Sequence, residues 1–416
     1  MNTPEQATFS LFSGELAENP FTLLAQLRSL GAIVPVPFPL GGTERQVWVV
    51  TRMEEAVRIL KDHVHFTVDR RIISDTSLFG QNAEEHTNLS APPSFFSAGT
   101  SMLTVDMPDH RRLRTLISKA FTPRYIEGLR PRVQQIADEL LNQVQEQGQM
   151  DLVEEYAFPL PINVISEMLG VPQADRARVR VWSAALATGL GLGKREPGII
   201  AHIQAFADYA AHLVADKRQH PADDLVSQLT AIEEQGDRLS EAELLSMITL
   251  LIFAGHETTS NLIATGTLML LDHPAQFEKL KADLSLVPLA IEELLRFNGP
   301  AMIAGPRYAT EEIEVAGQRI QQGDIVIPIL RSANRDESQF TEPDELDIAR
   351  ALNRHIAFGQ GIHTCLGAPL ARLEGDIAFT TLLRRMPGLR LNIPRDNITW
   401  HFSLNSQSLA ALPIAF

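Results

Sequence analysis

The sequence predicts a mainly α-helical protein with a small β region, arranged around one long central helix. Apolar residues recur with helical spacing over several long segments, whereas alternating, strand-like segments are short and clustered. The longest helical pattern runs from Ser240 to Leu271 and, at 1.5 Å per residue, would span about 45 Å. Because that length matches the width of a whole globular protein, we expect this helix to organise the fold.

The remaining predicted elements follow from the same two periodicities. Helices are expected over 106–119, 126–147 and 199–219, and strands at QVWVV (46–50), EIEVAGQRI (312–320) and DIVIPIL (324–330). Residues 72–100 show neither pattern. A loop of that length within a compact protein is usually either functional or mobile.

Composition excludes several classes of protein. The chain has 416 residues and a net charge of −15, which argues against a nucleic-acid binder, because such proteins neutralise phosphates with Lys and Arg. The most apolar stretch, 244–255, is too short to span a bilayer, and the N-terminal segment lacks the pattern of a signal peptide. A single cysteine excludes an intrachain disulfide and fits a reducing compartment such as the cytoplasm.

Length alone would suggest two or three domains. No repeat, low-complexity segment or Gly/Ser-rich linker divides the chain, however, and we therefore expect a single domain over residues 1–416.

The predicted central helix contains an unusual polar segment. Ser240 followed by Glu243 is a capping box, and Pro274 marks the stop. Between them lies AGHET (254–258), which places glycine and polar residues in an apolar pattern. The Thr258 hydroxyl can bond to the carbonyl four residues earlier and bend the helix, and Gly255 permits a local opening. Such a defect in a buried helix indicates a functional site.

The only cysteine, Cys365, lies within FGQGIHTCLG (358–367). An isolated cysteine is commonly an inert buried side chain, and a zinc site would need four ligands where His363 and Cys365 supply two. The glycines instead permit close backbone approach and positive φ, and the helix that follows can stabilise a thiolate through its N-terminus. Phe358 can shield the sulfur from water.

The pattern F-G-x-G-x-H-x-C-x-G resembles the haem-binding loop of the cytochrome P450 family, and APLAR (368–372) continues it in the bacterial form. The resemblance implies the cytochrome P450 fold, with haem b between the long central helix and the cysteine loop. It implies Cys365 as the axial thiolate ligand of the iron, with Phe358, Gly359 and Ala254 against the haem. A thiolate ligand favours O–O cleavage.

Two further patterns resemble motifs of the same family. His110 and Arg114 match H-x-x-x-R and, with Arg307 and His363, are implied to bind the haem propionates through charge-assisted hydrogen bonds; His355 is a further candidate. A second motif, E-x-x-R, is matched by Glu293 and Arg296, and its third member would be Arg350. The resemblance gives this trio a structural role.

AGHET resembles the oxygen-activation motif A-G-x-[D/E]-T. It implies that Thr258 positions a water molecule or the dioxygen and that Glu257 relays protons from solvent through water. His256 receives no role. The implied activity is insertion of one oxygen atom from O2 into an apolar organic substrate, by hydroxylation or epoxidation. A peroxide-driven enzyme and a non-catalytic haem-thiolate gas or redox sensor are the alternatives.

The resemblance also indicates a substrate class and partners. It is to the bacterial branch that hydroxylates macrolides and polyketides, with terpenes, steroids and fatty acids as alternatives. A separate ferredoxin or flavodoxin with an NAD(P)H reductase is expected to supply electrons, and Arg111, Arg112, Lys119 and Arg372 are candidates for its docking patch. The predicted substrate pocket consists of Leu250, Leu251, Ala254, Met302, Ile303 and Leu404.

Overall fold

The computed structural model describes residues 20–40, 43–69, 71, 101–192, 197–234, 237–402 and 406–416. The predicted irregular segment 72–100 and the predicted pocket residue Leu404 lie outside these ranges.

Helices dominate the described chain, as predicted. They are α2 (Pro20–Leu30), α3 (Met53–Lys61), α5 (Asp109–Ala120), α6 (Pro123–Gly128), α7 (Arg130–Val144), α8 (Pro159–Met168), α9 (Arg176–Leu192), α10 (Pro197–Gln219), α11 (Leu225–Ala231), α12 (Glu241–Asp272), α13 (Pro274–Ala282), α14 (Val287–Asn298), α15 (Leu330–Ala333) and α16 (Ala368–Arg385).

The strands are short. They are β1 (Ile33–Leu40), β2 (Thr43–Val50), β3 (Phe66–Thr67), β4 (Gln149–Asp151), β5 (Glu233–Glu234), β6 (Asp237–Arg238), β7 (Arg307–Ala309), β8 (Ile313–Val315), β9 (Gln318–Ile320), β10 (Ile325–Pro328), β11 (Arg390–Leu391), β12 (Trp400–Phe402), β13 (Gln407–Leu409) and β14 (Pro413–Ala415).

The largest sheet has five strands in the order β1-β2-β10-β7-β3. It contains two of the predicted strand segments, QVWVV in β2 and DIVIPIL in β10, which pair in parallel with Val326 opposite Trp48. The third predicted segment forms the β8–β9 hairpin. The sequence analysis does not predict β1, because Pro35 and Pro37 remove backbone donors; the strand tolerates them because it lies at the sheet edge.

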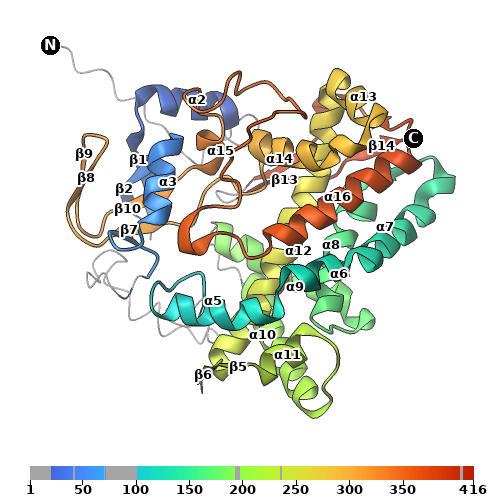
Figure 1. The fold of residues 1–416 in the computed structure, drawn as a ribbon, viewed down its shortest axis with the longest axis horizontal. Helices are drawn as coiled ribbons and strands as arrows, with labels where there is room; N and C mark the ends of the chain where they lie inside the picture. Colours follow the sequence, from blue (N-terminus) through green and yellow to red (C-terminus); the bar gives the residue numbers. More distant parts are fainter. Residues whose placement is uncertain are drawn as a thin grey trace.

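The central helix is confirmed as α12, which passes through the middle of the molecule with the five-stranded sheet to one side (Figure 1). Its N-terminus carries the predicted capping box, in which the Glu243 N–H donates to the Ser240 hydroxyl and the Ser240 N–H donates to the Glu243 carboxylate. The helix packs against α8, α10, α14 and α16. Burial from several sides explains why its sequence is apolar around most of its circumference.

Two predicted helix boundaries were wrong. The single helix expected over 126–147 is divided into α6, which ends at Gly128, and α7, which begins at Arg130. Pro131 explains the break, because its ring would collide with the carbonyl four residues earlier in a continuous helix. The helix expected from residue 106 begins at Asp109 as α5, and Asp106 lies outside it and bonds to another segment. No helix in the described part of the chain combines the length and apolar character that crossing a membrane requires.

Candidate active site

The middle of α12 presents accessible residues on an otherwise buried helix. Ala254 and Thr258 are exposed, although Ile252 and the residues from Thr259 to Leu270 are buried. The Thr258 hydroxyl donates to the Ala254 carbonyl at 3.0 Å, the bond expected from the sequence. Of the predicted apolar neighbours, Leu251 is half-buried, whereas Leu250 is only 5% exposed. The accessible face therefore runs along Leu251, Ala254 and Thr258, with Leu250 turned into the core.

Gly255 and His256 occupy the other side of this segment. The helix is continuous there, so the local opening expected at Gly255 is absent from α12. Gly255 instead allows close packing on α8, since a Cβ atom would lie 3.0 Å from Ile165. His256 is buried, its Nδ1 lies 2.8 Å from the Ile252 carbonyl, and its ring packs edge-on against Phe158. Burial lowers the pKa of His256 to about 4 and keeps the ring neutral.

The neighbouring Glu257 is a carboxyl group in an apolar setting. Burial raises its pKa, because removing the charged form from water is unfavourable. A carboxyl with a raised pKa is suited to proton transfer near neutral pH.

The cysteine loop lies between two fixed elements, α3 on one side and α16 on the other. A short 3-10 turn, Gly361–His363, contacts α3, and the Cys365 N–H donates to the Phe358 carbonyl at 2.9 Å. Gly359 and Gly361 have φ values of 70° and 77°, as predicted for the glycines of this loop. Gly367 differs: its φ is −80°, and a Cβ there would lie 3.9 Å from the Cys365 sulfur, an ordinary contact distance.

The Cys365 side chain is exposed, although its loop packs against α3. Burial raises the pKa of its thiol, whereas the N–H groups of Gly367 and Ala368 and the guanidinium groups of Arg114 and Arg372 act in the opposite direction. These donors and charges stabilise a thiolate once a cation occupies the space in front of the sulfur.

Gly361 makes the closest backbone approach in this loop and supports a prediction. A Cβ at residue 361 would lie 2.3 Å from the Leu60 carbonyl oxygen and 3.0 Å from the Lys61 Cα. Gly361→Ala must displace the loop from α3, in addition to a left-handed backbone cost of about 1–2 kcal/mol. We expect purified Gly361→Ala to retain little prosthetic group and to unfold at lower urea concentration.

Gly317 provides the matched control for Gly361. Its φ is 76°, and nothing lies within 4 Å of a Cβ built there. Gly317→Ala should show only the backbone cost and keep its full prosthetic-group content. Equal behaviour of the two variants would contradict the steric explanation.

A cluster of cationic and donor side chains lies between α5, β7 and the cysteine loop. His110 is 2% exposed, its Nε2 is buried without a hydrogen-bond partner, and its ring meets the His363 ring edge-on at 4.4 Å. Arg307 is 5% exposed, donates to the carbonyls of Gly305 and Pro306, and has its pKa lowered to about 10 by burial. Among the described residues, no carboxylate pairs with Arg307 or Arg114, so the cluster is suited to an anionic ligand.

Asp106 is a part of this cluster that sequence reasoning missed. Its carboxylate accepts from the Thr67 hydroxyl at 2.6 Å and the Val68 N–H at 2.9 Å, and lies 2.9 Å from Nε2 of His363. His363 is therefore held by Asp106 through one ring nitrogen. The available signal was the position of Asp106, four residues before His110 in DMPDH.

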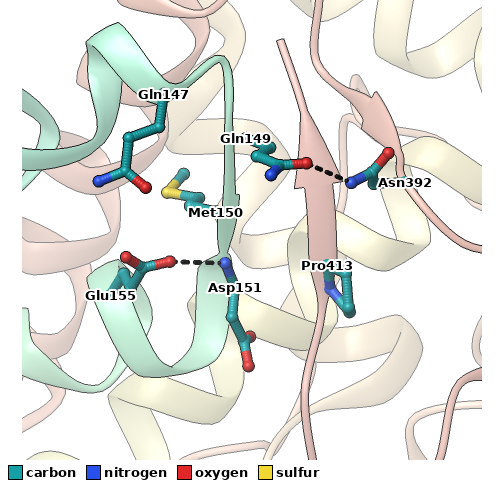
Figure 2. A pocket seen from close by; sticks show the side chains of 7 residues that line it. All are labelled: Gln147, Gln149, Met150, Asp151, Glu155, Asn392 and Pro413. Atoms are coloured by element: carbon teal, nitrogen blue, oxygen red, sulfur yellow. Dashed lines mark hydrogen bonds between the residues drawn. The ribbon is translucent and has the colours of Figure 1, made fainter.

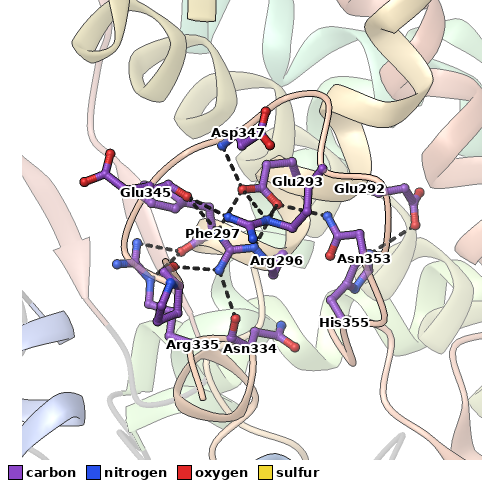
Figure 3. Close-up of polar contacts among 12 residues, drawn as sticks. Glu292, Glu293, Arg296, Phe297, Asn334, Arg335, Glu345, Asp347, Asn353 and His355 are labelled. Carbon is purple, nitrogen blue, oxygen red and sulfur yellow. Dashed lines mark hydrogen bonds and ion pairs between the residues drawn. The ribbon is translucent and has the colours of Figure 1, made fainter. Parts of the chain in front are cut away.

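The structure brings Glu293 and Arg296 together in the core (Figure 3), and Arg350, whose side chain is 12% exposed, bonds to the same carboxylate. Both oxygens of Glu293 lie 2.8 Å from Arg296, and the Arg350 Nε lies 3.1 Å from one of them. Glu293 also accepts from the Asp347 N–H and the Asn353 amide, and Arg296 donates to three carbonyls, those of Asn334, Pro343 and Glu345. The network ties α14 to the segment that leads into the cysteine loop.

Other candidates take different positions. Met302 and Ile303 are 1% and 8% exposed and pack in a core cluster with β1 and β2 residues, so the structure does not bring them to the accessible face of α12. His355, considered for the propionates, bonds instead to Glu292 through Nε2 and to the Ala357 N–H through Nδ1. Two members of the basic patch are paired, Arg112 with Glu243 and Arg372 with Glu292.

One surface pocket of about 290 Å³ is lined by residues of the paired strands β4 and β14 and by Gln147, Glu155 and Asn392 (Figure 2). Its two carboxylates already accept hydrogen bonds: Glu155 from the Asp151 N–H, and Asp151 from the N–H groups of Val153 and Leu412. None of the predicted site residues lines it.

Comparison with known proteins identifies the family. The sequence model of the family described as "Cytochrome P450" matches residues 197–387. The chain is 47% identical to cytochrome P450 CYP107DY1 of Priestia megaterium over 89% of each chain. It belongs to the cytochrome P450 family. It is also 40% identical to the polyketide biosynthesis cytochrome P450 PksS of Bacillus subtilis over 99% of each chain. The solved structure of myxobacterial CYP267B1 in complex with myristic acid superposes with a TM-score of 0.88, at 41% identity over 98% of each chain.

These findings confirm a helical cytochrome P450 fold and an enzyme, a haem-dependent monooxygenase that uses an organic substrate, O2 and electrons from redox partners. Cytochromes P450 bind haem through a cysteine thiolate, and Cys365 is the only cysteine of this chain. The residues present fit that group. Accessible Ala254, Thr258 and Cys365 leave room for it, and buried Arg307 and His110 find no anionic partner within the described chain, a partner that propionates would supply.

Proposed function

We propose that this cytochrome P450 hydroxylates or epoxidises a polyketide or a related secondary metabolite, acting as one catalytic domain over residues 1–416 in the cytoplasm. The observation that carries the proposal is the 40% identity to PksS across 99% of both chains, since the name of that relative places it in polyketide biosynthesis. The apolar, accessible face of α12 around Leu251 and Ala254 supports an apolar substrate.

Each site residue receives a role in this proposal. Cys365 would ligate the iron, with Phe358 and Gly359 beside the sulfur. His110, Arg114 and Arg307 would hold the propionates, and Asp106 would orient His363 among them. Haem supplies the site of dioxygen reduction. Of the six residues predicted to border the substrate, Leu251 and Ala254 keep that proposed role because they are accessible. Leu250, Met302 and Ile303 lie in the core, and Leu404 lies outside the described residues.

The reaction consumes two protons, and α12 carries the groups that would deliver them. Glu257 has a carboxyl whose pKa is raised by burial, which is suited to taking a proton from water and releasing it inward. The Thr258 hydroxyl, already bonded to the Ala254 carbonyl, has its oxygen free to accept from water and hold it in place. These two residues are the proposed catalytic pair.

Thr258→Ala tests the second member of this pair. The variant should fold and bind haem normally, because the Thr258 side chain is exposed and its hydroxyl bonds to the Ala254 carbonyl of its own helix. We expect product formed per NAD(P)H to fall by about tenfold or more, with hydrogen peroxide released instead. The measurement is NAD(P)H consumption against product and peroxide.

Thr267 offers the control for that experiment. It makes the same bond to the carbonyl four residues earlier, at 2.8 Å to Ile263, further along α12. Thr267→Ala should leave the product yield per NAD(P)H unchanged. Unaltered yield in Thr258→Ala would remove Thr258 from the mechanism.

Electrons are proposed to come from a separate ferredoxin or flavodoxin with its NAD(P)H reductase. Of the four basic residues proposed for its docking, Arg111 and Lys119 are exposed on α5, and Arg112 and Arg372 pair with Glu243 and Glu292. Such surface charges steer association, and their effect should weaken with salt.

The substrate class is tested by titrating the haem-loaded enzyme with polyketides, macrolides, terpenes, steroids and fatty acids while recording the haem absorption spectrum. Hits are then reconstituted with a ferredoxin and reductase under 18O2, and the product is examined by mass spectrometry. Polyketide binding with incorporation of one 18O atom is the expected result. Tight binding and oxidation of fatty acids alone would favour the second candidate, a fatty-acid hydroxylase, which the similarity to CYP267B1 in complex with myristic acid supports.

A further inference from the structure

Three side chains form a connected network below the cysteine loop, and neither the family motifs nor the proposed function assigns it a role. Glu292 of α14 receives two hydrogen bonds from Arg372 of α16, at 2.6 and 2.8 Å. The other end of the network is His355, whose Nε2 lies 3.1 Å from Glu292 (Figure 3). His355 has a side chain only 2% exposed, and its Nδ1 accepts from the Ala357 N–H at 3.1 Å.

These contacts define which ring nitrogen of His355 carries the proton. Because Nδ1 accepts a backbone hydrogen bond, Nε2 carries the proton and donates it to Glu292. Burial would raise the pKa of Glu292, but the hydrogen bonds from Arg372 and His355 lower it to about 2. Glu292 therefore carries a full negative charge at neutral pH.

The network reaches the cysteine in two ways. The Arg372 guanidinium lies over the Phe358 ring, 4.6 Å from its centre, and Phe358 in turn accepts the hydrogen bond from the Cys365 N–H through its carbonyl. The Arg372 charge and the Cys365 thiolate also attract each other directly. Glu292 is the carboxylate that pairs with Arg372 and neutralises its charge.

We propose that Glu292 and Arg372 are positioning residues that set the net charge felt by the Cys365 thiolate and fix Phe358 beside it, and thereby set the reduction potential of the bound haem, while His355 holds Glu292 in place. The proposal rests on the cysteine–haem bond of the family and not on the substrate class. A positive charge near the thiolate favours the reduced iron, and a compensating negative charge opposes it. When Arg372 and Glu292 are paired, their opposite effects on the reduction potential balance each other.

The test uses charge-removing variants of similar shape in the haem-loaded protein. Glu292→Gln leaves Arg372 without its counter-charge, so the reduction potential should become more positive. Arg372→Gln leaves Glu292 unbalanced, so the potential should become more negative. The double variant should return close to the wild-type value. The measurement is spectroelectrochemical titration, with the ferrous–carbon monoxide spectrum recorded to verify that the thiolate is retained.

The chain offers a closely matched control in Glu167 and Arg132. This pair has the same two-bond geometry, at 2.8 and 2.7 Å, and side-chain exposures of 26% and 41% against 26% and 43% for Glu292 and Arg372. Glu167→Gln should leave the potential unchanged. Potentials for Glu292→Gln and Arg372→Gln that equal the wild type or shift in the same direction would overturn the proposal. A shared shift would indicate loosening of the loop instead of a charge effect. Neither result depends on the identity of the substrate.

Discussion

Glu293→Gln is expected to unfold the protein or to leave it without haem. Glu293 and Arg296 are both 0% exposed, and Glu293 accepts bonds from Arg296, Arg350, Asp347 and Asn353. The variant leaves the buried Arg296 guanidinium without a counter-charge, and breaking a buried pair by removing one partner costs about 3–5 kcal/mol. A loss of that size is a large fraction of the free energy of unfolding of an ordinary domain.

Urea denaturation and the haem-to-protein ratio after purification measure this effect. The matched control is Glu127→Gln, because Glu127 and Arg130 form another Glu–Arg pair three residues apart in the sequence, with exposed side chains. Exposed pairs contribute little, so the control should denature close to the wild type. Comparable loss in the two variants, or normal haem content in Glu293→Gln, would show that the buried network is dispensable.

Cys365→Ser is expected to abolish monooxygenase turnover while leaving the fold intact. Cys365 is exposed and its side chain makes no hydrogen bond within the described residues beyond those offered by the Gly367 and Ala368 N–H groups, so little packing is lost. A serine hydroxyl stays protonated at neutral pH and cannot replace the thiolate ligand. Any haem retained should therefore lack the thiolate-type absorption of its ferrous–carbon monoxide complex.

The neighbouring Thr364→Ser provides the comparison for Cys365→Ser. Thr364 donates to the Gly361 carbonyl at 2.7 Å, a bond that serine can also make, so this variant should keep the thiolate spectrum and turnover. Circular dichroism on both variants separates loss of the ligand from loss of the fold. A thiolate-type spectrum in Cys365→Ser would show that Cys365 is not the ligand.

Local sequence patterns were sufficient to predict the features that depend on residues close together in the chain. The capping box consists of two residues three positions apart, Ser240 and Glu243. The bond from Thr258 to Ala254 follows from helical geometry alone. The cysteine loop is equally local, since its glycines, Phe358 and Cys365 occupy ten consecutive residues, 358–367. Strand β1 could not be predicted in this way. Its prolines argue against a strand, and they are tolerated only because β1 lies at the edge of the sheet.

The sequence by itself therefore determined the fold class, through apolar periodicity along the chain. It also determined the cysteine thiolate and the motif on α12, because each of these lies within one turn or one loop. Only the tertiary structure decided which distant groups meet. Asp106 bonds to His363, which is 257 residues away in the sequence. Glu292 pairs with Arg372, which is 80 residues away, and also bonds to His355, a candidate for the propionates. It also placed Met302 and Ile303 in the core. The sequence around a single carboxylate or apolar residue does not indicate which distant residue it will contact. Packing decides that contact, together with the free-energy cost of leaving a buried charge unpaired.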